Sequence, residues 1–98
     1  MAYTQIEYVV QGAVARINHN RPEARNAESQ TLLDEMDAAL AEAVKNDDVR
    51  VIIIGGNGPH FSAGHDLKEA QATRAGFTAE ERWEYEELRY LGYCLRIW

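Results

Sequence analysis

The groups best placed to do chemistry follow a short apolar run in the middle of the chain, V-I-I-I at residues 51–54. This β-branched run is bounded by glycines and is typical of a strand that is buried on both faces. Gly55, Gly56 and Gly58 then allow positive φ angles, so the chain is expected to turn away from the core. Because Asp66 stands where a helix N-cap would, free backbone N–H groups should converge at the carboxyl end of this strand.

Converging backbone amides suit an anion or an oxyanion, because unpaired N–H groups at a loop-to-helix junction carry partial positive charge. The same glycines also fit a plain connection to a short capped helix. Two phosphate-binding patterns are absent. A dinucleotide fingerprint counted from Gly56 requires glycine where Phe61 stands, and no P-loop G-K-S or G-K-T occurs. An oxyanion site and a simple capped turn both stay open at this point.

Metal and hydrolase sites are disfavoured in this stretch. His60 and His65, with Asp66 beside them, lack the i,i+4 spacing of a helical zinc pair, and no cysteine is near. Ser62 lies outside any nucleophile-elbow pattern, so a Ser-His-Asp arrangement cannot be argued. The sequence therefore predicts no metal site and no serine nucleophile.

Length and composition predict one small domain, residues 1–98. Ten basic and sixteen acidic side chains give a net charge of −6, which disfavours binding to nucleic acid. No window approaches eighteen consecutive apolar residues, and no signal peptide is visible, so we expect a cytoplasmic protein without membrane contact. Cys94 is the single cysteine, which excludes an intrachain disulfide, and its apolar surroundings predict a buried thiol.

The first half of the chain has the pattern of strand, strand, helix and strand. Residues 6–10 and 13–18 are strand-like and flank Gly12, which suits the left-handed position of a hairpin turn. Residues 19–26 have no apolar periodicity and contain Pro22, so an ordered loop is predicted there. A helix is expected over residues 29–45, followed by the strand at 51–54, so parallel pairing through a right-handed crossover is expected. The core stripe of the helix is predicted to contain Leu32, Leu33, Met36, Leu40, Ala43 and Val44.

The second half is predicted to be helical, and residues 70–76 are expected to form the end of a short helix and a mobile surface loop. Thr78 and Glu81 have the spacing of a capping box, so a helix should begin there and run to Trp98. Its apolar and aromatic side chains require a surface to pack against, which we expect from chain beyond this sequence or from an oligomer. The apolar stripe consists of Leu88, Leu91, Leu95 and Trp98. The charged solvent face is expected to carry Glu80, Glu81, Glu84, Glu86 and Glu87.

Two blocks of the sequence resemble the enoyl-CoA hydratase/isomerase family, also called the crotonase superfamily. They are F-S-A-G-H-D-L-K-E, preceded by V-R-V-I-I-I-G-G-N-G, and N-R-P-E-A-R-N-A at residues 20–27. The resemblance covers essentially the whole chain but only the N-terminal part of the family's usual length. It implies an α/β protein with the crotonase-like (ClpP/crotonase) ββα-type spiral fold, of which residues 1–98 are the N-terminal portion of a single domain.

The resemblance implies a function in fatty acid metabolism, the addition of water to a 2-enoyl-CoA thioester or its isomerisation. Two backbone N–H groups stabilise the enolate oxygen in this family, and one of them belongs here to His65. Many members have alanine at that position, so the His65 imidazole could itself contact substrate. Coenzyme A enters as part of the substrate, with no separate cofactor. The residues implied to contact substrate or coenzyme A are Glu23, Ala24, Arg25, Ala63, Gly64, His65, Asp66, Leu67 and Lys68.

Two of these residues leave alternatives open. Lys68 suits a phosphate contact or simple solvation, and Glu23 replaces the basic residue that is common at its position. The family's second oxyanion amide and its acid and base glutamates cannot be assigned here. Alternatives are therefore a non-catalytic module that binds coenzyme A or a partner, and a helical assembly protein without a coenzyme A pocket. The family also implies a homo-oligomer, a trimer or hexamer, for the full-length protein.

Overall fold

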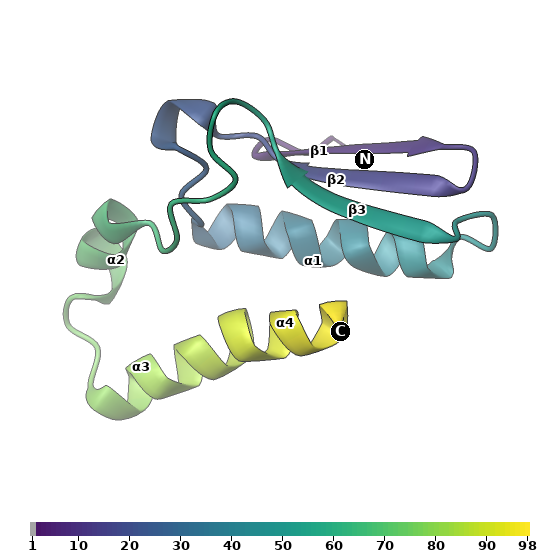
Figure 1. Ribbon diagram of the computed structural model, residues 1–98. Helices are drawn as coiled ribbons and strands as arrows, with labels where there is room; N and C mark the ends of the chain where they lie inside the picture. The colour runs from purple at the N-terminus through teal and green to yellow at the C-terminus, as the bar shows by residue number, and fades with distance from the viewer. Residues whose placement is uncertain (1) are drawn as a thin grey trace. The chain divides into compact units, whose positions relative to one another are not determined.

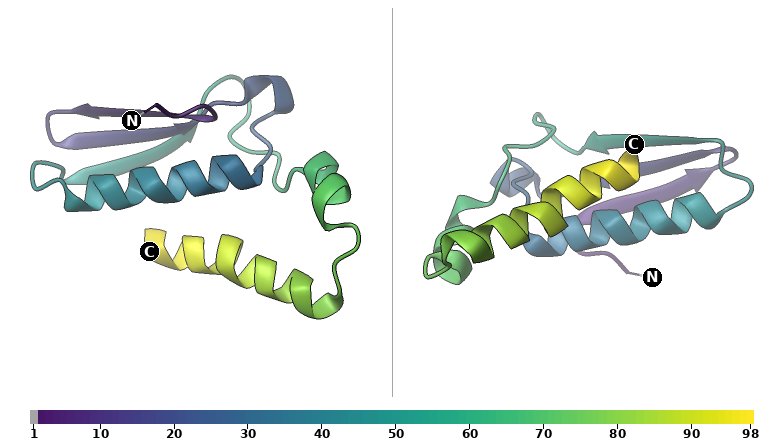
Figure 2. Two further views of the ribbon diagram at one scale, coloured as in Figure 1. Left: turned by 180° about the vertical axis from the view of Figure 1, so that it is seen from behind. Right: turned by 90° about the horizontal axis from the view of Figure 1, so that it is seen from below.

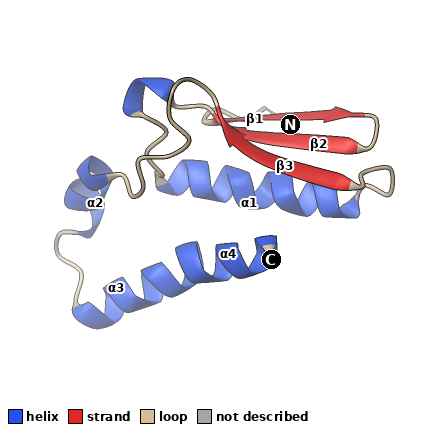
Figure 3. Ribbon diagram, in the orientation of Figure 1, coloured by secondary structure: helices blue, strands red, loops and turns tan. Residues whose placement is uncertain are grey.

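The structure is a computed structural model that describes residues 2–98. The chain divides into two compact units, one that ends at Gly64 and one that spans His65–Trp98. The expected α/β composition is confirmed, since the first unit combines strands with a helix and the second is helical (Figure 3).

The first unit is a three-stranded sheet with one long helix. Strands β1 (Ile6–Gln11), β2 (Val14–His19) and β3 (Val51–Gly56) lie in the order β1-β2-β3, and α1 (Gln30–Lys45) runs along one face (Figures 1 and 2). β1 pairs with β2 in an antiparallel hairpin, and β2 pairs with β3 in parallel. The predicted hairpin and the predicted parallel pairing are both confirmed, with Gly12 at a φ of 59° in the turn.

Helix α1 supplies most of the core of this unit. The Ser29 hydroxyl caps it by accepting the N–H of Leu32 at 3.1 Å, which satisfies one of the end amides. Burying a side chain such as Leu32, which is fully covered, contributes about 1.5–3 kcal/mol. Val44 was predicted in the core stripe but is 70% exposed, because it lies one position beyond Ala43 and points away from the sheet. The buried helix residues are Leu32, Leu33, Met36, Ala39, Leu40 and Ala43.

Strand β3 departs from the prediction of a strand buried on both faces. Val51 is 50% exposed and Ile53 is 38% exposed, while Ile52 is better covered. Side chains alternate across a strand, and α1 covers only one face of a sheet in which β3 is an edge, so the other apolar face stays open (Figure 3). The expected glycine turn also starts later, because Gly55 and Gly56 belong to β3 and Gly58 is the first to adopt positive φ, at 85°.

The second unit begins with helix α2 (Leu67–Arg74). The carboxylate of Asp66 accepts the N–H of Glu69 at 3.1 Å and caps this helix, as predicted. The helix end that was expected within residues 70–76 is found at Arg74, so the loop that follows is shorter than expected. Arg74, at its last turn, is only 9% exposed.

A longer helical segment follows, formed by α3 (Ala79–Glu86), a π-helical turn η2 (Glu87–Leu91) and α4 (Gly92–Ile97). The predicted capping box is confirmed. Thr78 Oγ1 accepts the N–H of Glu81 at 3.1 Å, and the Glu81 carboxylate accepts the N–H of Thr78 at 3.0 Å.

The predicted apolar stripe of this segment is exposed: Leu88 and Leu95 at 60%, Leu91 at 53% and Trp98 at 100%. Cys94 is exposed as well, so the prediction of a buried thiol was wrong, because the described residues around α4 leave its face open. Among residues 2–98, no helix combines the length and the apolar character that a membrane crossing requires.

Candidate functional site

The two sequence blocks of the first unit are joined by backbone hydrogen bonds. The first block forms a short 3-10 helix η1 (Pro22–Ala24) and then passes through left-handed conformations. The N–H of Ala63 donates to the carbonyl of Arg25 at 3.1 Å, and the N–H of Glu28 donates to the carbonyl of Gly64 at 2.7 Å. Arg25 and Ala63, both predicted site residues, are therefore held side by side.

Asn26 organises this junction, although the sequence analysis gave it no role. Its side chain is fully buried and its φ of 55° is one that asparagine tolerates better than most residues. Its Nδ2 donates to the carbonyls of Asn57 at 2.9 Å and His60 at 2.7 Å, and its Oδ1 accepts the N–H of Arg21 at 2.8 Å. The sole sequence signal was its place inside the N-R-P-E-A-R-N-A block.

Gly56 allows the loop after β3 to pack closely against the strand. A Cβ atom added there would lie 2.7 Å from the carbonyl oxygen of Phe61 and 3.0 Å from Nδ2 of Asn26. The same Phe61 carbonyl lies 2.9 Å from Nδ1 of His19, a buried residue of β2. The glycine therefore serves a close approach of the loop and not the turn that the sequence suggested.

The two backbone amides just before residue 65 have acceptors within the first unit. The N–H of Ala63 is taken by Arg25, and the N–H of Gly64 donates to Oγ of Ser62 at 3.0 Å. Gly64 has a φ of 89°, which favours glycine. No hydrogen bond from the His65 N–H is found within residues 2–98. This amide is thus available for an acceptor that does not come from the described chain.

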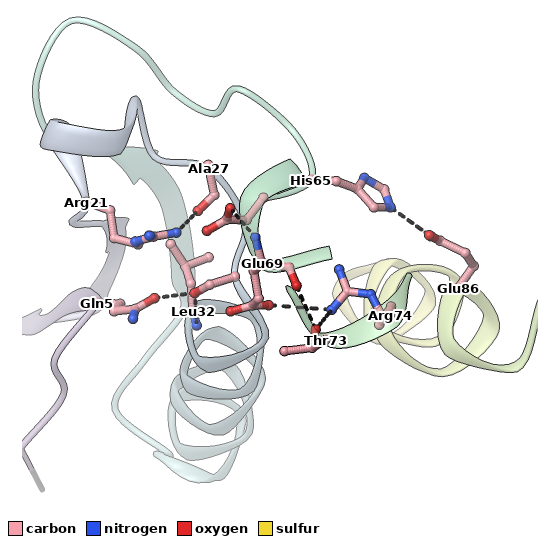
Figure 4. A network of polar contacts seen from close by, with 11 residues as sticks. Gln5, Arg21, Ala27, Leu32, His65, Glu69, Thr73, Arg74 and Glu86 are labelled. Atoms are coloured by element: carbon pink, nitrogen blue, oxygen red, sulfur yellow. Dashed lines mark hydrogen bonds and ion pairs between the residues drawn. The ribbon is translucent and has the colours of Figure 1, made fainter. Parts of the chain in front are cut away.

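The side chain of His65 belongs to the second unit and is held there by two residues of the C-terminal helical segment. Its Nε2 lies 2.8 Å and 2.9 Å from the two carboxylate oxygens of Glu86 (Figure 4). Its ring stacks on that of Tyr90 at 3.9 Å between centroids. Glu86 was predicted as part of a plain solvent face. It is exposed, as predicted, and it also has a specific partner, which fixes the orientation of the imidazole.

A cavity of about 400 Å³ lies within the second unit, and His65 is one of its lining residues. This volume is at the lower end of the range for small-molecule pockets. The lining combines apolar side chains with arginine, tyrosine and glutamate. Its residues are His65, Leu67, Ala70, Gln71, Arg74, Ala75, Phe77, Arg82, Tyr85 and Glu86.

One wall of this cavity is a stacked pair. The guanidinium of Arg74 lies 4.1 Å from the ring centroid of Tyr85, a distance that gives a favourable cation–π contact. Arg74 also lies 3.6 Å from the Glu69 carboxylate (Figure 4). Burial raises the pKa of the Tyr85 phenol, and the nearby Arg74 charge opposes that rise. The Tyr85 hydroxyl is buried, and no described residue forms a hydrogen bond with it.

The remaining predicted site residues are found on exposed parts of both units. Glu23 lies in η1 and is exposed, next to the partly covered Ala24. Leu67 lines the cavity and is 73% exposed, whereas Lys68 is an exposed residue of α2. Whether these side chains contact coenzyme A stays a prediction.

The sequence profile of the enoyl-CoA hydratase/isomerase family matches residues 10–93. The chain belongs to this family. A crystal structure of a probable enoyl-CoA hydratase from Mycobacterium smegmatis is 47% identical, with a TM-score of 0.82, and the match covers 98% of this chain and 36% of that one. The crystal structure of an enoyl-CoA hydratase/isomerase from Xanthobacter autotrophicus Py2 is 34% identical, with a TM-score of 0.89, over 99% of this chain and 35% of that one. The predicted crotonase fold is thereby confirmed.

The relatives of this chain are named for more than one reaction, since some are called hydratases and one is called an isomerase. A trans-2-decenoyl-acyl-carrier-protein isomerase from Streptococcus mutans is 38% identical over 71 residues, which are 72% of this chain and 27% of that protein. The chain therefore spans about a third of the length of the relatives that it matches. Family membership is shared, while the reaction differs between relatives.

Proposed function

We propose that this chain binds an acyl-CoA thioester, with the backbone N–H of His65 as one oxyanion donor. The observation that carries the proposal is the pairing of two features at one residue. The His65 amide has no acceptor within the described residues, and His65 also lines a cavity of about 400 Å³. A thioester oxygen at the amide would place the attached acyl group beside that cavity.

The chemistry follows from where charge develops. When a proton leaves or a nucleophile adds next to a thioester, negative charge grows on the carbonyl oxygen, and a fixed N–H group stabilises it without reorganisation. The neighbouring residues Gly64 and Asp66 hold this amide in place. Gly64 has a φ of 89°, which would be strained for any other residue, and Asp66 caps α2. The two N–H groups that precede this amide, those of Ala63 and Gly64, are occupied by acceptors of the first unit.

Coenzyme A itself would lie along the predicted block around the loop, with backbone groups of residues 63–68 and the segment 23–25 beside it. Lys68, which is exposed and forms no ion pair within residues 2–98, can approach a phosphate. In this proposal coenzyme A is part of the substrate and no separate cofactor is required.

The backbone donor can be tested without changing a side chain. Replacing the amide between Gly64 and His65 by an ester, through chemical synthesis, removes one N–H group. We expect calorimetric binding of crotonyl-CoA to weaken about five-fold, the effect of one lost hydrogen bond. Free coenzyme A lacks the thioester carbonyl, so its binding should not change. Equal binding of crotonyl-CoA by the ester and the amide would refute the role of this N–H.

A matched variant separates the backbone from the imidazole. His65→Ala keeps the N–H and removes the ring that contacts Glu86 and Tyr90. If this variant retains crotonyl-CoA binding while the ester binds more weakly, the result supports the backbone N–H as the donor to the thioester oxygen. The reverse result would assign the contact to the imidazole.

For the whole protein we propose the hydration or isomerisation of a 2-enoyl-CoA thioester. A second candidate for the chain alone is binding without turnover, because Glu86 is the one carboxylate that lines the cavity and His65 already engages it. A decrease in the absorbance of the enoyl thioester, which reports turnover, distinguishes the two candidates. We expect no decrease with the 98-residue chain. Measurable turnover by this chain would exclude the second candidate. A trimer or hexamer also stays a prediction, which sedimentation analysis can check.

A further inference from the structure

The imidazole of His65 has a carboxylate partner on only one of its two nitrogens. Nε2 lies 2.8 Å and 2.9 Å from the two carboxylate oxygens of Glu86 (Figure 4). Because an ionised carboxylate only accepts hydrogen bonds, Nε2 carries a proton, and in the neutral ring Nδ1 then holds a lone pair. Within residues 2–98, Nδ1 forms no hydrogen bond. A carboxylate on one nitrogen and a free lone pair on the other is the arrangement that orients a histidine base.

A second contact fixes the plane of this ring. The Tyr90 ring stacks on the imidazole with 3.9 Å between centroids and 13° between planes. Glu86 holds the Nε2 edge and Tyr90 holds the face, so the direction of Nδ1 is fixed as well. His65 also lines the cavity of the second unit, and its side chain is 41% exposed, so the ring is accessible to a ligand there.

Nδ1 is the ring nitrogen nearer to the main chain, because it is bonded to Cγ whereas Nε2 lies on the far side of the ring. His65 therefore carries two groups close to each other. One is the backbone N–H, which has no acceptor among the described residues, and the other is the lone pair of Nδ1. In a thioester, the α-carbon is attached to the carbonyl carbon. An oxygen bound at the His65 N–H thus brings the α-carbon near Nδ1 of the same residue.

We propose that His65 is a catalytic residue whose Nδ1 takes a proton from the α-carbon of the bound thioester, with Glu86 as its positioning residue. The bond between the α-carbon and its hydrogen breaks, and its electron pair forms the double bond of an enolate. Negative charge moves to the thioester oxygen, which the His65 N–H stabilises. The proton stays on Nδ1, and the Glu86 carboxylate stabilises the imidazolium.

Return of the proton to the same carbon restores the thioester, so the step consumes nothing and adds no water. It is therefore compatible with the absence of hydration that we expect from the 98-residue chain. This inference rests on the proposed function, since the thioester oxygen must lie at the His65 N–H. It adds a base to the oxyanion donor of the same site.

Deuterium exchange at the α-carbon provides the test. In deuterium oxide, a proton that reaches Nδ1 is replaced from the solvent before it returns. We expect the 98-residue chain to exchange the α-protons of butyryl-CoA faster than the same solution without protein, as followed by NMR. His65→Ala keeps the backbone N–H and should retain butyryl-CoA binding, while exchange slows about 100-fold, the contribution of a general base. Free imidazole added to this variant should restore part of the rate.

Glu86→Gln tests the positioning role. The glutamine amide can donate to Nε2, which moves the ring proton to Nδ1 and removes its lone pair. We expect exchange to slow about ten-fold through this change of tautomer, with unchanged binding of butyryl-CoA. Glu84→Gln is the matched control, because Glu84 is an exposed residue of the same helix and its replacement changes the net charge equally. It should leave the exchange rate unchanged.

Each result separates this inference from the proposed function. If butyryl-CoA binds but exchanges no faster than without protein, the base is overturned while acyl-CoA binding stands. If butyryl-CoA does not bind, the proposed function fails and this inference fails with it. Undiminished exchange in His65→Ala would overturn the assignment to His65. Equal rates in Glu86→Gln and in the unchanged chain would overturn the role of Glu86.

Discussion

The side-chain nitrogen of Asn26 lies 2.7 Å from the carbonyl oxygen of His60, although 34 residues separate them in sequence. This bond ties the loop that follows β2 to the loop that follows β3. Both loops contain predicted site residues, and the position of each depends on the other. Asn26 is therefore a positioning residue for the proposed site, although it is fully buried.

The first prediction concerns the amide of Asn26. Asn26→Asp keeps the shape of the side chain but replaces its Nδ2 by an oxygen. The carbonyls of Asn57 and His60 then lose the hydrogen bonds that Nδ2 donates to them. We expect the free energy of unfolding to fall by about 2–3 kcal/mol, measured by urea denaturation. Asn20→Asp is the control, because Asn20 is exposed, and it should change the value by less than about 0.5 kcal/mol. Equal effects of the two variants would contradict the role of Asn26.

The second prediction tests the close approach at Gly56. A Cβ atom in Gly56→Ala would lie 2.7 Å from the Phe61 carbonyl oxygen, which is backbone and cannot swing away. We expect a loss of about 1–3 kcal/mol in the free energy of unfolding. Gly76→Ala has open space around the new methyl group and no positive φ, so it should be neutral or slightly stabilising. A neutral Gly56→Ala would show that the loop has room to move.

The third prediction separates backbone strain from binding. Gly64 and Gly12 have φ angles of 89° and 59°, and an added Cβ meets no atom within 4 Å at either position. Alanine at each should therefore cost about 1–2 kcal/mol through the backbone alone. Only Gly64→Ala is expected to weaken crotonyl-CoA binding, about five-fold, because it moves the adjacent His65 amide. Unchanged binding by Gly64→Ala would argue against the site.

The fourth prediction concerns alkaline pH. Burial raises the pKa of Tyr85 above its ordinary value of 10.0, and burial raises the pKa of Tyr3 and Tyr8 as well. A phenol with a raised folded-state pKa contributes stability that is complete below pH 10 and is lost as pH rises through that pKa. Urea denaturation above pH 10 should show this loss.

Tyr85→Phe isolates the contribution of one phenol, since it leaves Tyr3 and Tyr8 in place. Its stability should decline less steeply above pH 10 than that of the unchanged chain. An ultraviolet titration of the phenolate checks the same point independently. If Tyr85 ionised at its ordinary pKa, the two slopes would coincide.

Local chemistry made much of this fold predictable from sequence. Asp66 and Thr78 each stand at the start of a helix, and their capping bonds depend only on residues three positions away. Gly12 in the hairpin turn is equally local. The block around Ala63 was predicted as a site through its resemblance to the enoyl-CoA hydratase/isomerase family, since its glycines and the cap at Asp66 were equally consistent with a simple capped turn.

The remaining features depend on contacts between distant residues, and so the sequence pattern could not supply them. Asn26 meets His60 only because two loops converge at one end of the sheet. The exposure of Val51 and of Cys94 reflects which faces the other elements cover, not the apolar character of the local sequence. The pairing of Glu86 with His65 likewise joins residues that are 21 positions apart.

The open side of β3 has a consequence for handling the protein. In the sheet described, β3 has a neighbouring strand on one side only. Its sequence V-I-I-I-G-G contains neither a charged residue nor a proline, the residues that prevent a further strand from pairing with an edge. Such an edge is a template for adding a strand from a second molecule, and this begins most easily in crowded solution. Changing Ile53, which is 38% exposed, to lysine should therefore delay fibril formation in concentrated samples, visible as a longer lag in thioflavin fluorescence.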